Sequence, residues 1–324
     1  MKKSAIPLQD YITGIKSGNT VMLSRAITLL ESQLESHRDM ANEILSAIIP
    51  HTGNSIRLGI TGIPGAGKST FIEALGTILC NQGHRLAVLA IDPSSPVTGG
   101  SLLGDKVRMQ ELSRHPNAFI RPSPSSGTLG GTAKRTREAL LLCEAAGFDT
   151  IFIETVGVGQ SEVAVRSMVD FFLLLLVSGA GDEIQGIKRG ILEMADSIII
   201  NKADGNNIPM AKKTQEQYQR MLSLLQPITG HWTPSVLACS STEKTGINEF
   251  WLILQKFICI TKKTKLFAQR RSQQNVEWFN TLVHERIYEN FKKQKLFEEK
   301  LSQFQQEVAN GKIAASVAAQ MLVQ

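Results

Sequence analysis

The chain has 324 residues, of which 42% are hydrophobic and 20% are charged, a composition that is ordinary for a soluble protein with a sizeable core. Its most apolar run, residues 171–177, is far shorter than the roughly 20 residues that span a bilayer, and the N-terminus lacks a signal-peptide pattern. We therefore expect a cytoplasmic protein with no membrane segment.

The net charge of +6 is unevenly distributed. Residues 261–324 hold 11 Lys and Arg against 6 Glu and no Asp, which is a net charge of +5. These charges alternate with Glu and with apolar residues at helical spacing, a pattern typical of a solvated helix face. The sequence therefore gives little support to nucleic-acid binding.

The cysteines and histidines offer no metal-binding pattern. Cys80, Cys143, Cys239 and Cys259 are widely spaced, form no C-x-x-C pair and lie in apolar surroundings, which predicts reduced thiols in the core. The six histidines are scattered along the chain. A cysteine or histidine metal site is not expected.

In chain order, residues 1–50 show helical spacing and few strand signals, which predicts a helical N-terminal extension. Between residues 56 and 260, short apolar runs alternate with amphipathic helices, the pattern of a mostly parallel sheet with helices on both faces. A helix near 247–260 ends this domain, which we place at residues 51–260. We predict strands at residues 56–61, 86–91, 118–121, 150–154, 171–177, 197–201 and 235–239.

A glycine-rich loop follows the first predicted strand. The run Gly62-Ile63-Pro64-Gly65-Ala66-Gly67-Lys68-Ser69 fits G-x-x-x-x-G-K-[ST] between a strand and a helix, which predicts the P-loop NTPase fold of class α/β. Its backbone N–H groups would bind phosphate oxygens, Lys68 would add a positive charge, and Ser69 would hold Mg²⁺. The expected phosphate-binding residues are Gly62, Ile63, Pro64, Gly65, Ala66, Gly67, Lys68, Ser69 and Thr70.

Three carboxylates are candidates for ordering the magnesium ion. Asp92 and Asp105 lie in a long Gly-, Ser- and Pro-rich segment after the second strand, which is either a plain connector or part of the phosphate site. Glu154 ends the fourth strand, the Walker B arrangement, and Gly157 follows it with an N–H that could reach a γ-phosphate. Val158 stands where Ras-like enzymes carry a water-orienting Gln, so we expect slow intrinsic hydrolysis.

The sixth strand ends in Asn201-Lys202-Ala203-Asp204, which fits N-K-x-D. The Asp204 carboxylate can accept hydrogen bonds from guanine N1–H and the N2 amine, a donor pair that adenine lacks. Asn201 would bind the base or brace the phosphate loop, and the Lys202 stem would cover the ring. After the seventh strand, backbone N–H groups of Ser240, Ser241 and Thr242 could reach guanine O6. The expected ligands are GTP and GDP.

The last segment, residues 261–324, is expected to be a helical arm. Apolar residues recur in it at helical spacing: Val276, Phe279, Leu282, Val283, Ile287 and Phe291. Such a stripe packs either on a second subunit or on its own domain.

These motifs together resemble one family. The similarity is to MeaB, the methylmalonyl-CoA mutase-associated GTPase chaperone of bacteria. It rests on the segments 92–95 and 154–160 and on the N-K-x-D motif. In the second segment, which is the third G motif of GTPases, Glu154 stands where most GTPases have Asp. The loops at 96–101, 124–127 and 186–188 extend the similarity, which is close from about Leu58 to Ile247. Ser241 departs from the family, which more often has Ala there; we expect little effect if the backbone makes the contact.

The resemblance implies a homodimer, joined through the C-terminal arm, that gates cobalamin loading and protects or reactivates a B12-dependent acyl-CoA mutase. It implies switch loops at 92–105, 154–162 and 178–190, and acceleration of hydrolysis by the mutase. Gln185 and Lys188, in the third of these, are the candidates for that activation. With Lys68, Asp92 and Glu154, they complete the expected catalytic set.

Two other functions share some of these motifs. The same family has carried a label as a kinase linked to arginine and ornithine transport, but the sequence shows no separate phospho-acceptor or amino-acid-binding motif. A metal-delivery GTPase of the kind that serves nickel enzymes would share the P-loop, but it would need a His or Cys cluster.

Overall fold

The structure is a computed structural model, and it describes residues 6–92, 109–124, 129–155, 161–179, 189–292 and 295–323. The chain divides into two compact units, Met1–Phe267 and Ala268–Gln324. All seven predicted strands form, and they lie in the first unit. They are β1 (Ile56–Gly62), β2 (Leu86–Asp92), β3 (Ala118–Pro124), β4 (Thr150–Thr155), β5 (Phe171–Val177), β6 (Ser197–Asn201) and β7 (Ser235–Ala238).

The strands form one sheet in the order β3-β2-β4-β1-β5-β6-β7, and every neighbouring pair is parallel. Strand β1 lies at the centre, with Ile60 opposite Glu154 of β4 on one side and Leu173 of β5 on the other. Because all strands are parallel, their carboxyl ends lie at one edge of the sheet, where ligands bind in such folds. The phosphate loop leaves β1 at this edge.

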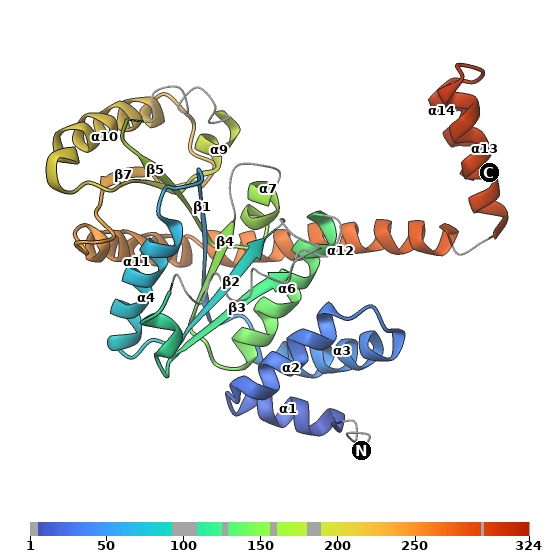
Figure 1. The fold of residues 1–324 in the computed structure, drawn as a ribbon, viewed down its shortest axis with the longest axis horizontal. Coiled ribbons are helices and arrows are strands. Elements are labelled where there is room, and N and C mark those ends of the chain that lie inside the picture. The colour runs from blue at the N-terminus through green and yellow to red at the C-terminus, as the bar shows by residue number, and fades with distance from the viewer. Residues whose placement is uncertain are drawn as a thin grey trace. The chain divides into compact units, whose positions relative to one another are not determined.

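Helices cover both faces of the sheet, which confirms the predicted α/β class (Figure 1). Helices α4 (Lys68–Asn81) and α11 (Ile247–Lys263) lie on one face; α6 (Leu129–Ala145) and α7 (Ser161–Arg166) lie on the other. The N-terminal helices pack on α6, and α9 and α10 pack beside β5, β6 and β7. Their bounds are α1 (Leu8–Lys16), α2 (Thr20–Glu31), α3 (Glu35–Ile48), α9 (Arg189–Met194) and α10 (Ile208–Ser223).

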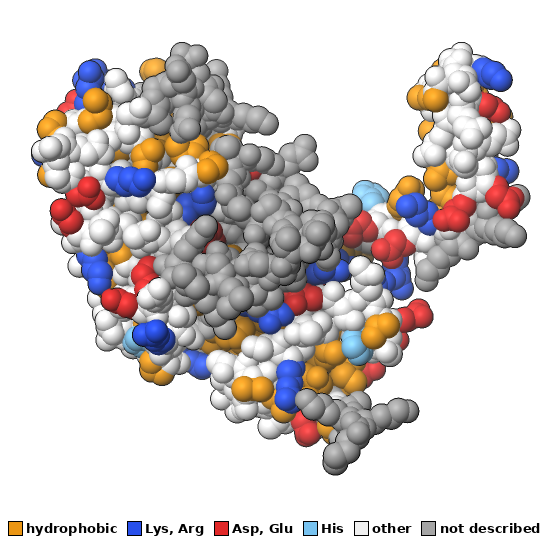
Figure 2. All heavy atoms as spheres, viewed as in Figure 1, with side chains coloured by type: hydrophobic (Ala, Val, Ile, Leu, Met, Phe, Trp, Pro, Cys, Tyr) orange, Lys and Arg blue, Asp and Glu red, His pale blue; other side chains and the backbone are white. Residues whose placement is uncertain are grey.

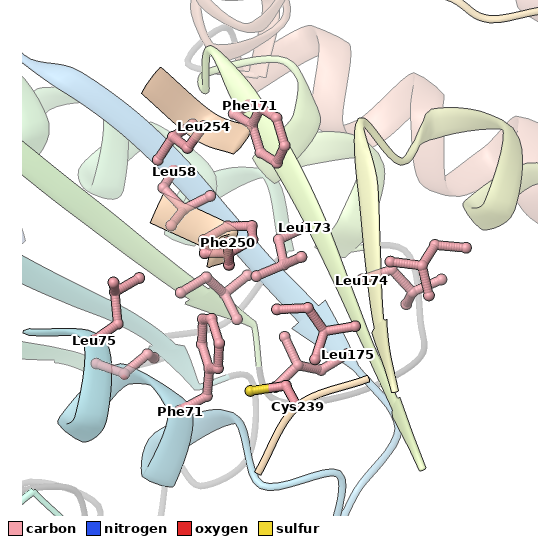
Figure 3. Close-up of a cluster of buried hydrophobic side chains, with 14 of the residues drawn as sticks. Leu58, Phe71, Leu75, Phe171, Leu173, Leu174, Leu175, Cys239, Phe250 and Leu254 are labelled. Atoms are coloured by element: carbon pink, nitrogen blue, oxygen red, sulfur yellow. The ribbon is translucent and has the colours of Figure 1, made fainter. Parts of the chain in front are cut away.

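The sheet is apolar on both faces because it is buried between two layers of helices. Side chains alternate along β4, so that Phe152 joins one hydrophobic cluster while Ile151 and Ile153 join the cluster on the opposite face. The first cluster is drawn in Figure 3, where Phe71 of α4 meets Phe250 of α11 edge to face at a centroid distance of 5.4 Å. The second cluster includes the buried faces of α1, α2 and α3. The N-terminal helices therefore belong to the core of the first unit.

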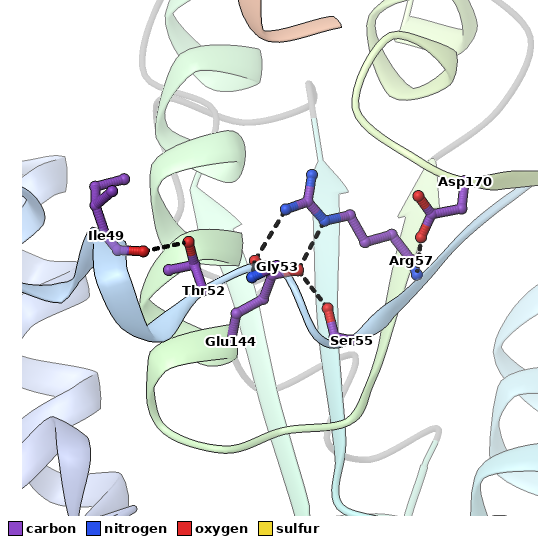
Figure 4. A network of polar contacts seen from close by, with 7 residues as sticks. All are labelled: Ile49, Thr52, Gly53, Ser55, Arg57, Glu144 and Asp170. Atoms are coloured by element: carbon purple, nitrogen blue, oxygen red, sulfur yellow. Dashed lines mark hydrogen bonds and ion pairs between the residues drawn. The ribbon is translucent and has the colours of Figure 1, made fainter. Parts of the chain in front are cut away.

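A buried polar network fixes the amino end of the central strand (Figure 4). The Arg57 guanidinium of β1 donates from Nε and Nη2 to Glu144 of α6, at 2.9 Å each. Ser55 Oγ and the Gly53 N–H also donate to Glu144, and the Arg57 N–H donates to Asp170 Oδ2 at 2.8 Å. A buried carboxylate needs this many donors to offset its desolvation. The network lies at the edge of the sheet opposite to the phosphate loop. Its role is to hold the start of β1 against α6.

Three of the four cysteines are buried as predicted, whereas the expectation for Cys259 is wrong. Cys80, Cys143 and Cys239 lie in the core, and Cys259 is exposed. On α11 its neighbours Phe257 and Ile258 face the core, so the apolar sequence around Cys259 belongs to the opposite side of the same helix.

Only Cys259 should react quickly with a thiol reagent in the native protein. Burial raises the pKa of Cys80 to about 11 and that of Cys239 to about 12, and burial also raises the pKa of Cys143. At pH 8 these three thiols are therefore protonated, and the thiolate is the nucleophile. Titration with a chromogenic disulfide should give one fast thiol per chain, none in a Cys259→Ser variant, and four in denaturant. Two or more fast thiols in the native chain would contradict this assignment.

The second unit consists of helix, as predicted for the C-terminal arm. It contains most of α12 (Leu266–Lys292), with α13 (Lys295–Ala309) and α14 (Ala315–Val323). Phe291 and Phe297 stack at a centroid distance of 5.6 Å within this unit. In Figure 2, Lys and Arg side chains of the unit are interspersed with Glu. The domain boundaries predicted at residues 50 and 260 stay a prediction.

No helix in the described part of the chain is long and apolar enough to cross a membrane.

Candidate functional site

The phosphate loop depends on glycine at two positions where backbone elements approach closely. A Cβ on Gly62 would lie 2.2 Å from the carbonyl oxygen of Leu175 on β5, so this position needs glycine. Gly67 has a φ of +86°, and a Cβ there would lie 2.7 Å from Asn201 Nδ2. Helix α4 begins at the next residue, Lys68, and its first-turn N–H groups have no acceptors one turn earlier in the helix. This is the geometry of an anion site at a helix N-terminus.

The Lys68 ammonium is buried within the loop. Its Nζ donates to the carbonyl oxygens of Gly62 at 2.8 Å and Ile63 at 3.2 Å, and the residue is 7% exposed. These two acceptors orient the side chain, which places a positive charge within the phosphate loop. Such a charge attracts the oxygens of a phosphate chain.

Ser69 and Glu154 lie together at the mouth of this loop. Ser69 Oγ, at the start of α4, donates to Glu154 Oε1 at the end of β4 over 3.1 Å. A hydroxyl and a carboxylate are the oxygen ligands that Mg²⁺ prefers, so this pair fits a magnesium ion that also binds phosphate oxygens. Among the described residues, no group of three His, Cys, Asp or Glu could hold a metal ion by itself.

A buried threonine pair that the sequence did not predict joins β1 and β4 beside Glu154. Thr155 Oγ1 donates to Thr61 Oγ1 at 2.8 Å, and both residues are fully buried. Thr61 precedes the phosphate loop and Thr155 precedes the segment that begins at Val156. The bond therefore holds the carboxyl ends of β1 and β4 side by side. Only the adjacency of β1 and β4 could have indicated it.

The N-K-x-D motif lies at the same edge of the sheet and contacts the phosphate loop. Asn201 Nδ2 donates to the Ala66 carbonyl oxygen at 2.8 Å, so Asn201 braces the loop, one of the two roles predicted for it. Asp204 Oδ2 accepts a hydrogen bond from Ser240 Oγ at 2.5 Å, which orients the carboxylate. Lys202 has a φ of +60°, a left-handed backbone conformation that residues other than glycine seldom adopt.

The loop after β7 completes this side of the site. It contains Ser240, Ser241 and Thr242, and is closed by an antiparallel bridge between Ser240 and Thr245. The Ser241 N–H, one of those expected near guanine O6, donates to Asn201 Oδ1 at 3.2 Å. Ser241 Oγ donates to the same atom at 2.8 Å, a contact that the sequence did not predict.

The structure thus brings together the phosphate loop, Glu154, the N-K-x-D motif and the loop after β7. Asp92 is the last residue of β2, at the same edge of the sheet, but its side chain lies outside the described part. Asp105, Gln185 and Lys188 lie outside the described residues. Their roles, and those of the segments around them, stay predictions.

The fold and this arrangement define a P-loop nucleotide-binding protein with a guanine-type base motif. The chain matches the family model described as "Methylmalonyl Co-A mutase-associated GTPase MeaB" over residues 23–296. It belongs to this family, as its sequence resemblance predicted, and it is a GTPase.

Relatives and a solved structure agree with this assignment. The chain is 48% identical to GTPase ArgK of Escherichia coli (strain K12) over 280 residues, 86% of this chain and 85% of ArgK. It is 45% identical to the mouse protein "Methylmalonic aciduria type A homolog, mitochondrial" over 321 residues, which is 96% of this chain and 77% of that protein. A crystal structure described as "LAO/AO transport system kinase" superimposes with a TM-score of 0.80 at 38% identity, covering 99% of this chain and 98% of that one.

Proposed function

We propose that this GTPase is a chaperone of a cobalamin-dependent acyl-CoA mutase, with methylmalonyl-CoA mutase as the client, and that it works in the cytoplasm. In this role it gates cofactor loading and protects or reactivates the mutase. The observation that carries the proposal is the match to a family named for its association with that mutase, over residues 23–296. This range contains the phosphate loop and the base motif.

In this proposal the phosphate loop and the base motif bind GTP from opposite ends. The residues Gly62, Ile63, Pro64, Gly65, Ala66, Gly67, Lys68, Ser69 and Thr70 hold the phosphates. Asp204 accepts the guanine donors, and its orientation by Ser240 supports this, since the carboxylate is already fixed before a base arrives. A preorganised acceptor loses less entropy on binding.

Mg²⁺ would be held by Ser69 and Glu154, with Asp92 and Asp105 nearby, directly or through water. The hydrogen bond between Ser69 and Glu154 supports the first pair, because it shows that both oxygens reach one point. When bound, the ion neutralises charge on the β- and γ-phosphate oxygens.

The client would set the rate of hydrolysis. Val158 occupies the place of a water-orienting Gln, so the proposal has a slow intrinsic rate that the mutase accelerates. Gln185 and Lys188 are the residues proposed for this activation, and the segments 92–105, 154–162 and 178–190 are the proposed switches. Helix α7 begins at Ser161, within the second segment, so a change in that segment would reach the helix layer.

A homodimer joined through the C-terminal arm is part of the proposal. On α12, Val276, Phe279, Val283 and Ile287 recur at intervals of three and four residues and are between 37% and 63% exposed. An exposed apolar stripe of this kind favours association with another helix. Sedimentation of the full chain should show a dimer at micromolar concentration; a monomer alone would contradict this part.

The chaperone role is tested by following methylmalonyl-CoA mutase during turnover, with and without this protein. With GTP present, the protein should slow the loss of mutase activity several-fold, and its Lys68→Ala variant should not. Equal loss of activity in both cases would reject the chaperone role. Transfer of labelled γ-phosphate from GTP to arginine or ornithine would instead support the kinase.

A further inference from the structure

We infer that Ser241 is a positioning residue of the nucleotide site, whose hydroxyl fixes the Asn201 side chain against the phosphate loop. The inference rests on the GTP site proposed above. It adds a residue whose side chain touches neither phosphate nor base in that proposal and acts through Asn201.

The contacts form a short chain of hydrogen bonds from the base side to the phosphate side. Ser241 Oγ donates to Asn201 Oδ1 at 2.8 Å, and the Ser241 N–H donates to the same oxygen at 3.2 Å. From the other end of the amide, Asn201 Nδ2 donates to the Ala66 carbonyl oxygen at 2.8 Å. Ser241 is 5% exposed, Asn201 1% and Ala66 0%, so water does not replace these bonds.

The Ser241 N–H and the Ala66 carbonyl decide which way the Asn201 amide points, and the hydroxyl adds a second, shorter bond to the Oδ1 atom that they orient. A carboxamide has nearly the same shape after a half-turn, and only its partners distinguish oxygen from nitrogen. In the turned state, Nδ2 would face the Ser241 N–H, donor against donor. Oδ1 would face the Ala66 carbonyl oxygen, acceptor against acceptor. Removing the hydroxyl leaves the buried Oδ1 with one longer hydrogen bond in place of two, which weakens the hold on the amide.

Asn201 also packs against the start of α4. A Cβ on Gly67 would lie only 2.7 Å from Asn201 Nδ2, so the amide is packed closely against the Gly67 backbone. A shift of the amide would therefore change the packing of the turn that leads into Lys68. On the other side, the loop after β7 is stiffened by the bridge from Ser240 to Thr245. Two successive serines thus have separate tasks: Ser240 orients Asp204, and Ser241 orients Asn201.

This inference replaces the expectation drawn from the sequence. That expectation was a contact through the Ser241 backbone alone, which would have made the side chain unimportant. The hydroxyl makes the shorter of the two contacts to Asn201 Oδ1, so the side chain matters as well as the backbone.

The test is the rate at which a fluorescent GDP leaves the full-length protein. Ser241→Ala should raise this rate about tenfold, equivalent to about 1.4 kcal/mol, and Ser241→Thr, which keeps the hydroxyl, should restore it to within about twofold. In an Asn201→Ala background, the further change Ser241→Ala should have less than about a twofold effect, because the partner is gone.

Ser197→Ala is the matched control. Ser197 is a fully buried serine at the other end of β6, and its hydroxyl donates to the Ser235 carbonyl oxygen at 2.9 Å. Its loss should lower the melting temperature and leave GDP release unchanged. The role of Ser241 would be overturned if wild type and Ser241→Ala released GDP at the same rate, or if Ser197→Ala accelerated release as much as Ser241→Ala. Neither result would overturn the proposed GTP site. A wild-type protein that binds no guanine nucleotide would overturn the proposed GTP site as well.

Discussion

Lys68→Ala should lower kcat/KM for GTP hydrolysis by about a hundred- to a thousand-fold, the usual loss when one preorganised electrostatic group is removed from a reaction centre. The physical reason is the position of Nζ, which the carbonyls of Gly62 and Ile63 hold inside the phosphate loop. Phosphoryl transfer depends on such charge placement more than on covalent chemistry. Release of inorganic phosphate at fixed GTP concentrations measures the change.

Lys256→Ala is the control for this experiment. Lys256 lies on α11, is exposed and carries the same charge, so its removal changes the net charge equally without touching the loop. Its kcat/KM should stay within about twofold of the wild type, as is usual for exposed substitutions. If Lys68→Ala were as active as Lys256→Ala, the phosphate loop would not be the reaction centre.

Asp204→Asn should weaken GTP binding about a hundredfold or more and should create binding of xanthosine triphosphate. The carboxylate matches two guanine donors, whereas an amide places its NH₂ group against the guanine N2 amine. Ser240 Oγ donates to Asp204 Oδ2 at 2.5 Å, so the amide would keep its oxygen toward Ser240 and turn NH₂ to the base. Xanthine carries a carbonyl in place of the N2 amine and accepts that bond. A site that hydrogen-bonds its ligand rejects a mismatched one strongly.

Competition of both triphosphates against a fluorescent GDP measures this exchange of specificity. Asp39→Asn, at an exposed position on α3, provides the same charge change far from the motif and should alter neither affinity. Loss of GTP binding with no gain for xanthosine triphosphate would indicate that the variant site is damaged. Unchanged preference for GTP would show that Asp204 does not read the base.

The strands and the position of the site could be predicted because local pattern determines them. All seven strands are short apolar runs, and each motif directly follows one of them, so parallel pairing brings the motifs to one edge. The predicted brace from Asn201 to the phosphate loop also follows from this placement, since β6 and β1 are separated only by β5.

The contacts that the sequence did not reveal join residues that are far apart in the chain. Arg57 meets Glu144, Thr61 meets Thr155, and Ser241 meets Asn201, and in none of these cases does spacing or composition mark the pair. Cys259 shows a related difficulty: an apolar stretch on a helix predicts burial for the stretch, but the helical turn exposes some of its members. The register of the strands and the rotation of each helix about its axis have to be known before such contacts can be deduced.

The central claim is that a partner controls the turnover of this GTPase. The most direct test is the rate of GTP hydrolysis by the purified protein, alone and with a cobalamin-dependent methylmalonyl-CoA mutase, with ATP as the control nucleotide. We predict a slow, GTP-specific rate that rises tenfold or more with the mutase, which corresponds to about 1.4 kcal/mol of activation free energy. A rate that the mutase leaves unchanged would contradict the proposed partnership, whereas the GTPase itself would stand.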